Sequence, residues 1–159
     1  NDGVCDIEIT TKMNYVPTDT ATCFECPERI FLAVPNNEKY SAVSSIDLQS
    51  VAQEDFISLM GSKQFRYICD KYCHQAGIVP KIVFESDSPA AVQNMIGANL
   101  GVGFWPEYTW GEVENERVKL LEIENPSCQR SIVVTCNSPE NENAVNFFNF
   151  VHDRLFERI

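Results

Sequence analysis

Polar residues stand at two points where an apolar segment gives way to a helical pattern. Residues 86–88 read Ser-Asp-Ser, and residues 60–62 read Met-Gly-Ser. Each triplet would lie at the carboxyl end of a strand and the start of a helix. Hydroxyl groups and free backbone N–H groups at such a junction bind small polar ligands in α/β proteins. The candidate ligand contacts from these segments are Met60, Gly61, Ser62, Ser86, Asp87 and Ser88.

The same residues also have a purely structural role. Ser88 precedes Pro89, which suits the first position of a helix, so the Ser88 hydroxyl can cap that helix. Ser62 is placed in the same way before the preceding helix. Capping and ligand contact are compatible, so both roles stay open. Asp87 would disfavour an anionic ligand unless a basic group offsets it, which favours neutral, zwitterionic or cationic compounds.

Enzymatic catalysis is not indicated. Nucleophilic catalysis needs a nucleophile with a base within reach. The chain has two histidines, His74 and His152, and neither neighbours a nucleophile elbow or a metal-binding motif. The segment Gly101-Val-Gly103 lacks the third glycine of a dinucleotide fingerprint and follows a helical pattern instead of opening one. We therefore expect no catalytic residues.

The seven cysteines allow more than one interpretation. Their odd count excludes complete pairing within the chain, and free thiols in a reducing cytoplasm are the simpler interpretation. Cys23 and Cys26 form a CxxC pair that could bind zinc together with Cys69, Cys73 and His74. The long gap after Cys26, and the apolar helical face that carries Cys69 and Cys73, favour packing instead. We expect no metal and no cofactor.

The acidic composition argues against nucleic-acid binding by these residues. The chain of 159 residues has a net charge of −11, and its 12 basic residues are scattered. Neutralising phosphates requires clustered lysine and arginine. No apolar run approaches the length of a membrane span. The length allows one ordinary core or two small lobes.

Hydrophobic periodicity predicts alternating strands and helices, which is the pattern of the α/β class. Strands are expected at residues 6–10, 28–34, 55–59, 81–84, 102–105, 118–123 and 131–135. Helices are expected at residues 62–75, at 89–99 and from a Ser138-Pro139 cap nearly to the C-terminus, with a helical turn at 46–51. Gly101 is expected to take the left-handed conformation that ends the middle helix.

Three motifs follow one another along the chain. They are Gly3-Val-Cys-Asp-Ile-Glu-Ile9, Glu28-Arg-Ile-Phe-Leu-Ala-Val-Pro35 and Gly101-Val-Gly-Phe-Trp-Pro106. In this order and at these intervals they resemble the effector-binding domain of LysR-type transcriptional regulators. The resemblance covers essentially the whole chain.

The resemblance implies an α/β fold of two lobes, of the type 2 periplasmic-binding-protein-like kind, with a truncated first lobe. Residues 1–35 and 115–159 would form the first lobe and residues 36–114 the second. A small-molecule effector would bind in the cleft between the lobes. This adds Thr10, Thr11 and Trp105 to the candidate effector contacts, although Trp105 fits a core position equally well.

The resemblance also implies the partners and the setting. The helix Pro89 to Asn99 resembles the one used for side-by-side dimerisation, so a homo-oligomer is expected. DNA contact would belong to a winged helix-turn-helix absent from this chain. The protein would be cytoplasmic, with no membrane contact. The alternative is an extracytoplasmic solute-binding protein of the same general fold, against which the seven cysteines and the absence of an export signal weigh.

Two departures from the family are visible. The chain lacks the opening strand–helix–strand–helix of the first lobe, so we expect residues 1–35 and 115–159 to form an incomplete sheet whose gap another chain fills. Residues Cys73-His-Gln-Ala-Gly77 resemble the helix end that carries one cysteine in peroxide-sensing members. The position of their reactive cysteine reads Gly61-Ser-Lys-Gln64 here, without a thiol, which argues against peroxide sensing.

Overall fold

The computed structural model describes residues 5–12, 21–60 and 63–156. These residues form two compact units, and the chain passes from one to the other at Glu28/Arg29 and back at Gln129/Arg130. Two strands, β2 (Thr22–Pro35) and β8 (Gln129–Cys136), contribute residues to both units. The buried clusters of the two units have no residue in common.

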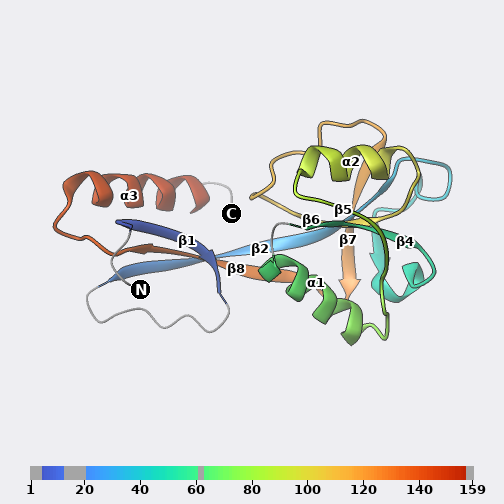
Figure 1. Cartoon of the computed structure of the whole chain (residues 1–159), viewed down its shortest axis with the longest axis horizontal. Coiled ribbons are helices and arrows are strands. Elements are labelled where there is room, and N and C mark those ends of the chain that lie inside the picture. Colours follow the sequence, from blue (N-terminus) through green and yellow to red (C-terminus); the bar gives the residue numbers. More distant parts are fainter. Residues whose placement is uncertain (1–4, 13–20, 61–62, 157–159) are drawn as a thin grey trace. The chain divides into compact units, whose positions relative to one another are not determined.

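The first unit is a small antiparallel sheet with one helix. Strand β1 (Ile7–Thr11) pairs with β8, and β8 lies next to β2. Helix α3 (Glu142–Phe156) lies along this sheet (Figure 1). Ala144 and Phe148 of α3 pack against Ile132 and Val134 of β8 and so form the centre of this core.

Asn141 caps α3, not Ser138-Pro139 as the sequence predicted. The Asn141 side-chain oxygen accepts hydrogen bonds from the N–H groups of Asn143, at 3.1 Å, and Ala144, at 3.4 Å. Asn141 in turn donates its own N–H to the Ser138 carbonyl. The Ser-Pro pair therefore makes the turn that leads into the helix, and asparagine satisfies its first free N–H groups.

The main sheet of the second unit has the strand order β6-β2-β7-β3. Besides β2, this sheet contains β6 (Gly103–Pro106), β7 (Val118–Asn125) and β3 (Ser45–Asp47). The short helix η1 (Leu48–Val51) follows β3. Both β6 and β7 pair antiparallel with the later part of β2. This pairing explains why these residues of β2 belong to the second unit.

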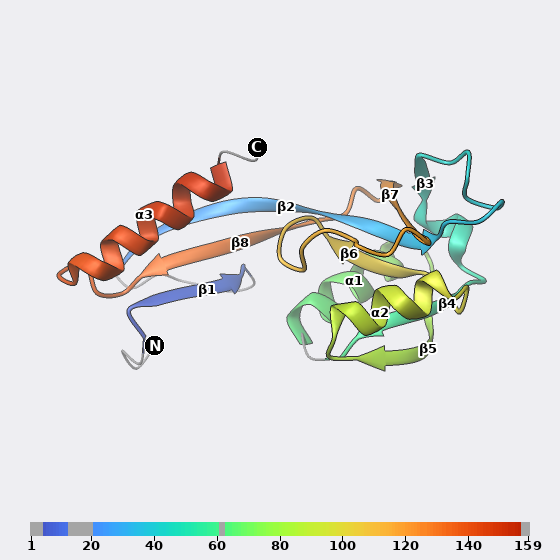
Figure 2. The same cartoon turned by 90° about the horizontal axis from the view of Figure 1, so that it is seen from above.

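A parallel pair of strands extends the second unit. Strands β4 (Asp55–Leu59) and β5 (Lys81–Ser86) lie side by side (Figure 2). Helix α1 (Lys63–Gln75) covers one face of the pair and α2 (Pro89–Gly97) the other (Figure 1). Because successive strand residues point to opposite faces, Phe56 shares a buried cluster with α1 and Ile57 shares one with α2.

Two glycines allow β6 to approach β4. Ile57 donates its N–H to the Val102 carbonyl at 2.8 Å, and Val102 donates to the Asp55 carbonyl at 2.9 Å. A Cβ atom on Gly101 would lie 2.3 Å from the Asp55 carbonyl oxygen, and one on Gly103 would lie 2.6 Å from that of Ile57. These positions accept no side chain without separating the strands.

Several predicted boundaries are corrected. The left-handed residue after α2 is Asn99, with φ of 62°, instead of Gly101. Strand β2 begins at Thr22, not at residue 28, and includes Pro27. Proline is tolerated there because β6 and β7 pair only with residues from Ile30 onward, which leaves this stretch of β2 at the edge of the described sheet.

The unit boundaries also differ from the predicted lobes of 1–35 with 115–159 and 36–114. The structure divides the chain at 28/29 and 129/130. Strand β7, which the sequence assigned to the first lobe, pairs with β2 and β3 inside the second unit. Pairing partners, and not local pattern, determine this assignment.

Candidate functional site

The carboxyl ends of β4 and β5 meet, as the sequence predicted. Leu59 and Ser86 are register partners, and the Met60 N–H donates to the Ser86 carbonyl at 2.7 Å. Met60 is 60% exposed, and Asp87 is also exposed. The structure therefore brings together Met60, Ser86, Asp87 and Ser88, which we call the carboxyl edge.

The two serine hydroxyls of the carboxyl edge organise its backbone. Ser88 Oγ accepts a hydrogen bond from the Ala91 N–H at 3.4 Å, which confirms it as the cap of α2. Ser86 Oγ accepts from the Ser88 N–H at 3.2 Å. A hydroxyl that accepts a hydrogen bond still carries a hydrogen that it can donate. The edge thus combines two hydroxyl donors with the Asp87 carboxylate.

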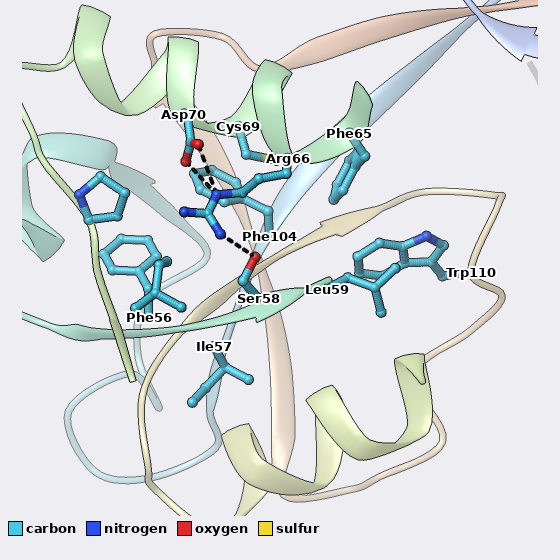
Figure 3. Close-up of a pocket in the computed structure, with 12 residues that line it drawn as sticks. Phe56, Ile57, Ser58, Leu59, Phe65, Arg66, Cys69, Asp70, Phe104 and Trp110 are labelled. Atoms are coloured by element: carbon cyan, nitrogen blue, oxygen red, sulfur yellow. Dashed lines mark hydrogen bonds and ion pairs between the residues drawn. The ribbon is translucent and has the colours of Figure 1, made fainter. Parts of the chain in front are cut away.

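An arginine from α1 stands next to this edge. Ser58 and Glu85 are register partners on β4 and β5, one residue before the edge. Arg66 Nη1 donates to Ser58 Oγ at 3.3 Å and to Glu85 Oε1 at 2.6 Å. Arg66 Nε lies 2.7 Å and 2.8 Å from the two Asp70 oxygens (Figure 3). The guanidinium therefore joins both strands to α1.

Among the side chains that the structure describes, those near the carboxyl edge carry no surplus positive charge. Burial opposes the charge on Arg66, but the hydrogen bonds that it donates to Asp70 and Glu85, and the negative charges of these carboxylates, outweigh this effect and raise its pKa. One guanidinium faces two carboxylates, and Asp87 adds a third negative group. An anionic ligand would therefore meet repulsion here, which agrees with the ligand class inferred from Asp87.

A cavity lies between α1 and β4, next to the Arg66 side chain. Its lining combines Ser58, Arg66 and Asp70 with aromatic rings such as Phe104 and Trp110 (Figure 3). Its volume is about 20 Å³, which is room for about one water molecule. A small-molecule ligand does not fit inside it, so the open carboxyl edge is the better candidate.

Trp105 does not line the carboxyl edge. Its side chain is 1% exposed and belongs to the buried cluster under α2. Trp105 Nε1 donates to the Gly111 carbonyl at 3.1 Å, and the Trp110 ring packs edge-on at a centroid distance of 5.2 Å. Of the two predicted roles, the structure supports the core position.

The remaining predicted contacts belong to the first unit or lie outside the described residues. Thr10 is half-buried on β1 in the first unit. Thr11 is 8% exposed, and its Oγ1 accepts from Arg130 Nη1 at 3.3 Å. Arg130 Nε also donates to Glu28 Oε2 at 2.6 Å in a buried ion pair. Gly61 and Ser62 lie outside the described residues.

The cysteines show no metal-binding arrangement. Cys23 is exposed and Cys26 is buried, because residues three apart on a strand point to opposite faces. Within residues 5–12, 21–60 and 63–156, no three His, Cys, Asp or Glu side chains are grouped to hold a metal. All seven cysteines are free thiols. Burial raises the pKa of Cys73 and of Cys128 to about 12, so neither forms a reactive thiolate at neutral pH.

Sequence reasoning missed the arginine network. Arg66 and Asp70 are four residues apart on a helix, which is a recognisable pairing signal. The contacts of Arg66 with Ser58 and Glu85 carry no such local signal, because they depend on how α1 packs against the strands.

The family of the chain follows from comparison with known proteins. The family model described as the LysR substrate binding domain matches residues 13–155, and the chain belongs to this family. The uncharacterized HTH-type transcriptional regulator YybE of Bacillus subtilis is 29% identical over 105 residues. That match covers 66% of this chain, and the chain spans 35% of the length of YybE.

Solved structures show the same fold. The C-terminal domain of a probable LysR family transcriptional regulator from Rhodococcus sp. RHA1 has a TM-score of 0.75 and 16% identity, covering 92% of this chain and 74% of that one. The effector binding domain of QuiR in complex with shikimate has a TM-score of 0.70 and 21% identity, covering 91% and 68%. The expected type 2 periplasmic-binding-protein-like fold is confirmed.

These relatives are transcriptional regulators, and they favour a regulatory domain over the alternative of an extracytoplasmic solute-binding protein. In the part of the chain that the structure describes, no helix is long and apolar enough to cross a membrane.

Proposed function

We propose that this chain senses a small-molecule effector on behalf of a transcriptional regulator. Membership of the LysR substrate binding domain family and the similarity to an HTH-type regulator support this function. The net charge of −11 is unsuited to phosphate contact, so DNA binding would belong to a helix-turn-helix domain outside these residues. The effector would act by binding two states of the regulator with different affinity.

The carboxyl edge carries the proposal. Met60 and Ser86 are joined by a backbone hydrogen bond of 2.7 Å, so the carboxyl ends of β4 and β5 are held together. Serine hydroxyls supply donors, and the described carboxylates around the edge outnumber Arg66, the one described cation beside them. The effector would be a small polar molecule without net negative charge. Thr10 of the first unit is a further proposed contact.

A small-molecule effector is supported by the QuiR neighbour, which was solved in complex with shikimate. Shikimate carries a carboxylate, so it is a useful probe of the charge argument. A preference for uncharged or cationic analogues over shikimate would agree with the excess of carboxylates at the carboxyl edge.

Self-association would use α2. Its inner face is buried through Val92 and Ile96, and Ala90 and Asn94 are exposed on its outer face. Small exposed side chains allow a second helix to approach closely. Ala90→Arg should shift the mass measured by light scattering toward the monomer, without changing the circular dichroism spectrum. An unchanged mass would remove α2 from the proposed interface.

A ligand screen followed by one substitution tests the effector site. A thermal-shift screen of metabolites, with shikimate included, would identify ligands that raise the midpoint of unfolding. Ser86→Ala removes a hydroxyl that accepts only from the Ser88 N–H among its described contacts. It should weaken binding of such a ligand by about two- to tenfold in calorimetry, the range of a lost hydrogen bond.

Ser50→Ala is the matched control. Ser50 is an exposed residue of η1, and its hydroxyl donates to the carbonyl of Asp47, the residue before η1, away from the carboxyl edge. It should leave the dissociation constant unchanged. If Ser86→Ala, Asp87→Asn and Thr10→Ala all bind the ligand as the unchanged chain does, the effector does not bind at the proposed contacts.

A further inference from the structure

The chain enters the second unit at Arg29 of β2 and leaves it at Gln129 of β8. We call these two the boundary residues. The Arg29 carbonyl accepts from the Glu107 N–H at 3.1 Å, and the Arg29 guanidinium lies 2.6 Å from Glu107 Oε1. Glu107 directly follows β6, which pairs with β2 from Ile30 onward. The contact at Arg29 therefore continues the ladder of the sheet.

The other boundary residue, Gln129, is held by a helix. The Tyr72 hydroxyl of α1 donates to the Gln129 carbonyl at 2.7 Å and accepts from the Gln129 N–H at 3.1 Å. One side chain thus pairs with both backbone groups of a residue that lies 57 positions further along the chain. Cys73 of α1 and Cys128, the residue before Gln129, share a buried cluster. The position of Gln129 therefore depends on α1 and not on strand pairing alone.

The same helix contacts the strands of the carboxyl edge through Arg66 (Figure 3). Arg66 donates to Ser58 and Glu85, which lie one residue before the edge on β4 and β5. Arg66 and Tyr72 are about 9 Å apart along the helix axis, from the rise of an α-helix. Hydrogen bonds and rigid helices of this kind carry energetic coupling between sites. Helix α1 thus contacts the candidate effector site through one side chain and a boundary residue through another.

The contacts of Arg66 divide into two kinds. Those with Ser58 and Glu85 join α1 to the strands, whereas that with Asp70 stays within the helix. The Arg66 and Glu85 side chains are 30% and 40% exposed, so solvent and solutes reach this ion pair. A ligand group that pairs with Glu85 would take a partner from Arg66, and the guanidinium would keep Asp70. Ligand binding would therefore loosen α1 from the strands without leaving Arg66 unpaired.

We propose that α1 passes the state of the carboxyl edge to the strand by which the chain leaves the second unit, with Tyr72 as the positioning residue. In one state, Arg66 holds α1 to Ser58 and Glu85. In the other, a ligand occupies Glu85, and the change in α1 reaches the Gln129 backbone through the Tyr72 hydroxyl. The signalling role rests on the effector function proposed above, but the link between Arg66 and Gln129 is a property of the chain without ligand.

Amide hydrogen exchange of the whole 159-residue chain, followed by NMR, tests the role of Tyr72 at the Gln129 N–H. Tyr72→Phe keeps the ring and removes the hydroxyl that accepts from this N–H. Exchange at Gln129 should become about two- to tenfold faster, the range of a lost hydrogen bond. Tyr67→Phe is the matched control, because Tyr67 is 60% exposed on the same helix, and it should leave the rate unchanged. An unchanged rate in Tyr72→Phe would overturn the proposal.

A double-mutant cycle tests transmission along α1 and needs no ligand, so it can fail while the effector site stands, and the reverse. Arg66→Met removes the contacts with Ser58 and Glu85. It should speed exchange at Gln129 at least about twofold when Tyr72 is present, and leave it unchanged in Tyr72→Phe. Lys71→Met removes a positive charge from an exposed position of α1 and should have no effect in either background. Equal acceleration by Arg66→Met in both backgrounds, or none in either, would overturn the transmission.

Discussion

The two units of this chain are stabilised in different ways. The second unit contains two buried clusters, which include large side chains such as Phe56, Leu121 and Trp105. The first unit has a single smaller cluster, formed by β8 and α3, and it also buries the ion pair of Glu28 with Arg130. Apolar burial therefore dominates the second unit, while the first depends in addition on a charge pair that is costly to disturb.

Both units carry exposed apolar side chains, and those of the second include Met60, Val79 and Leu100. In the first unit, Ile9 is 54% exposed on β1, and Phe147 and Phe150 are 49% and 56% exposed on α3. Strand β1 stands at the edge of the described sheet. These features agree with the expectation that another chain completes the sheet of the first unit. That expectation stays a prediction. The second unit, by comparison, carries the carboxyl edge on a core of its own.

The largest expected effect is in the core of the second unit. Trp105→Ala removes a ring that is 1% exposed, and should lower the free energy of unfolding by about 3–5 kcal/mol. Hydrogen exchange should then accelerate most in β4 and β6. Phe147→Ala, at an exposed position of the first unit, should change stability by less than about 0.5 kcal/mol. Greater loss of protection in α3 than in β6 would contradict two separate cores.

Next in size is the buried ion pair of the first unit. Glu28→Gln removes the carboxylate that lies 2.6 Å from Arg130 Nε, and should cost about 3 kcal/mol in urea unfolding because a buried guanidinium loses its counter-ion. Replacing both residues by methionine should cost less than the single change. A double variant less stable than Glu28→Gln would show that the pair itself is the main source of stability.

Alkaline pH should destabilise the second unit through Cys73 and Cys128. Their pKa rises from 9.0 to about 12 on burial, so between these values the unfolded thiols are ionised and the native ones are not. The unfolded state binds fewer protons, and stability falls by up to about 1.4 kcal/mol per pH unit for each thiol. Urea unfolding at pH 8 and pH 10 measures the fall, which should be shallower when both cysteines are replaced by alanine. An equal slope in that variant would assign the fall to other groups.

The smallest effect compares one helix cap in each unit. Ser88→Ala removes the cap of α2, and Asn141→Ala removes that of α3. Each should lower the free energy of unfolding by about 1 kcal/mol. Because the first unit has the smaller core, Asn141→Ala should lower the thermal midpoint at least as much as Ser88→Ala. A clearly larger shift for Ser88→Ala would weaken the ranking of the two units.

Local pattern was sufficient for the elements that position the site. The limits of β4 and the Ser88 cap of α2 were predicted because apolar spacing and capping residues are short-range signals. The predicted start of β2 was wrong, and the compact units divide the chain at other residues than the predicted lobes, because both depend on which strands pair. Pro27 suggested that the strand could not extend before residue 28. It does extend to Thr22, because β6 and β7 do not pair with β2 at Pro27.

The residues of the candidate site also separate into those that the sequence could place and those that it could not. Met60 and Ser86 could be placed together because parallel strands present their carboxyl ends at one edge. The burial of Trp105 could not be predicted, since every residue of β6 is buried and the strand shows no alternation. The network around Arg66 arises from packing between distant segments, which periodicity does not report.

Gly101 and Gly103 bear on how mutational surveys of this chain should be interpreted. A methyl group at either position would lie within 2.6 Å of a main-chain oxygen of β4, so nearly every substitution there should abolish signalling in a reporter assay. Neither glycine belongs to the carboxyl edge. An inactive variant at Gly101 or Gly103 would therefore look like one that has lost ligand binding, although its fold is what has failed. The yield of soluble protein separates these two cases.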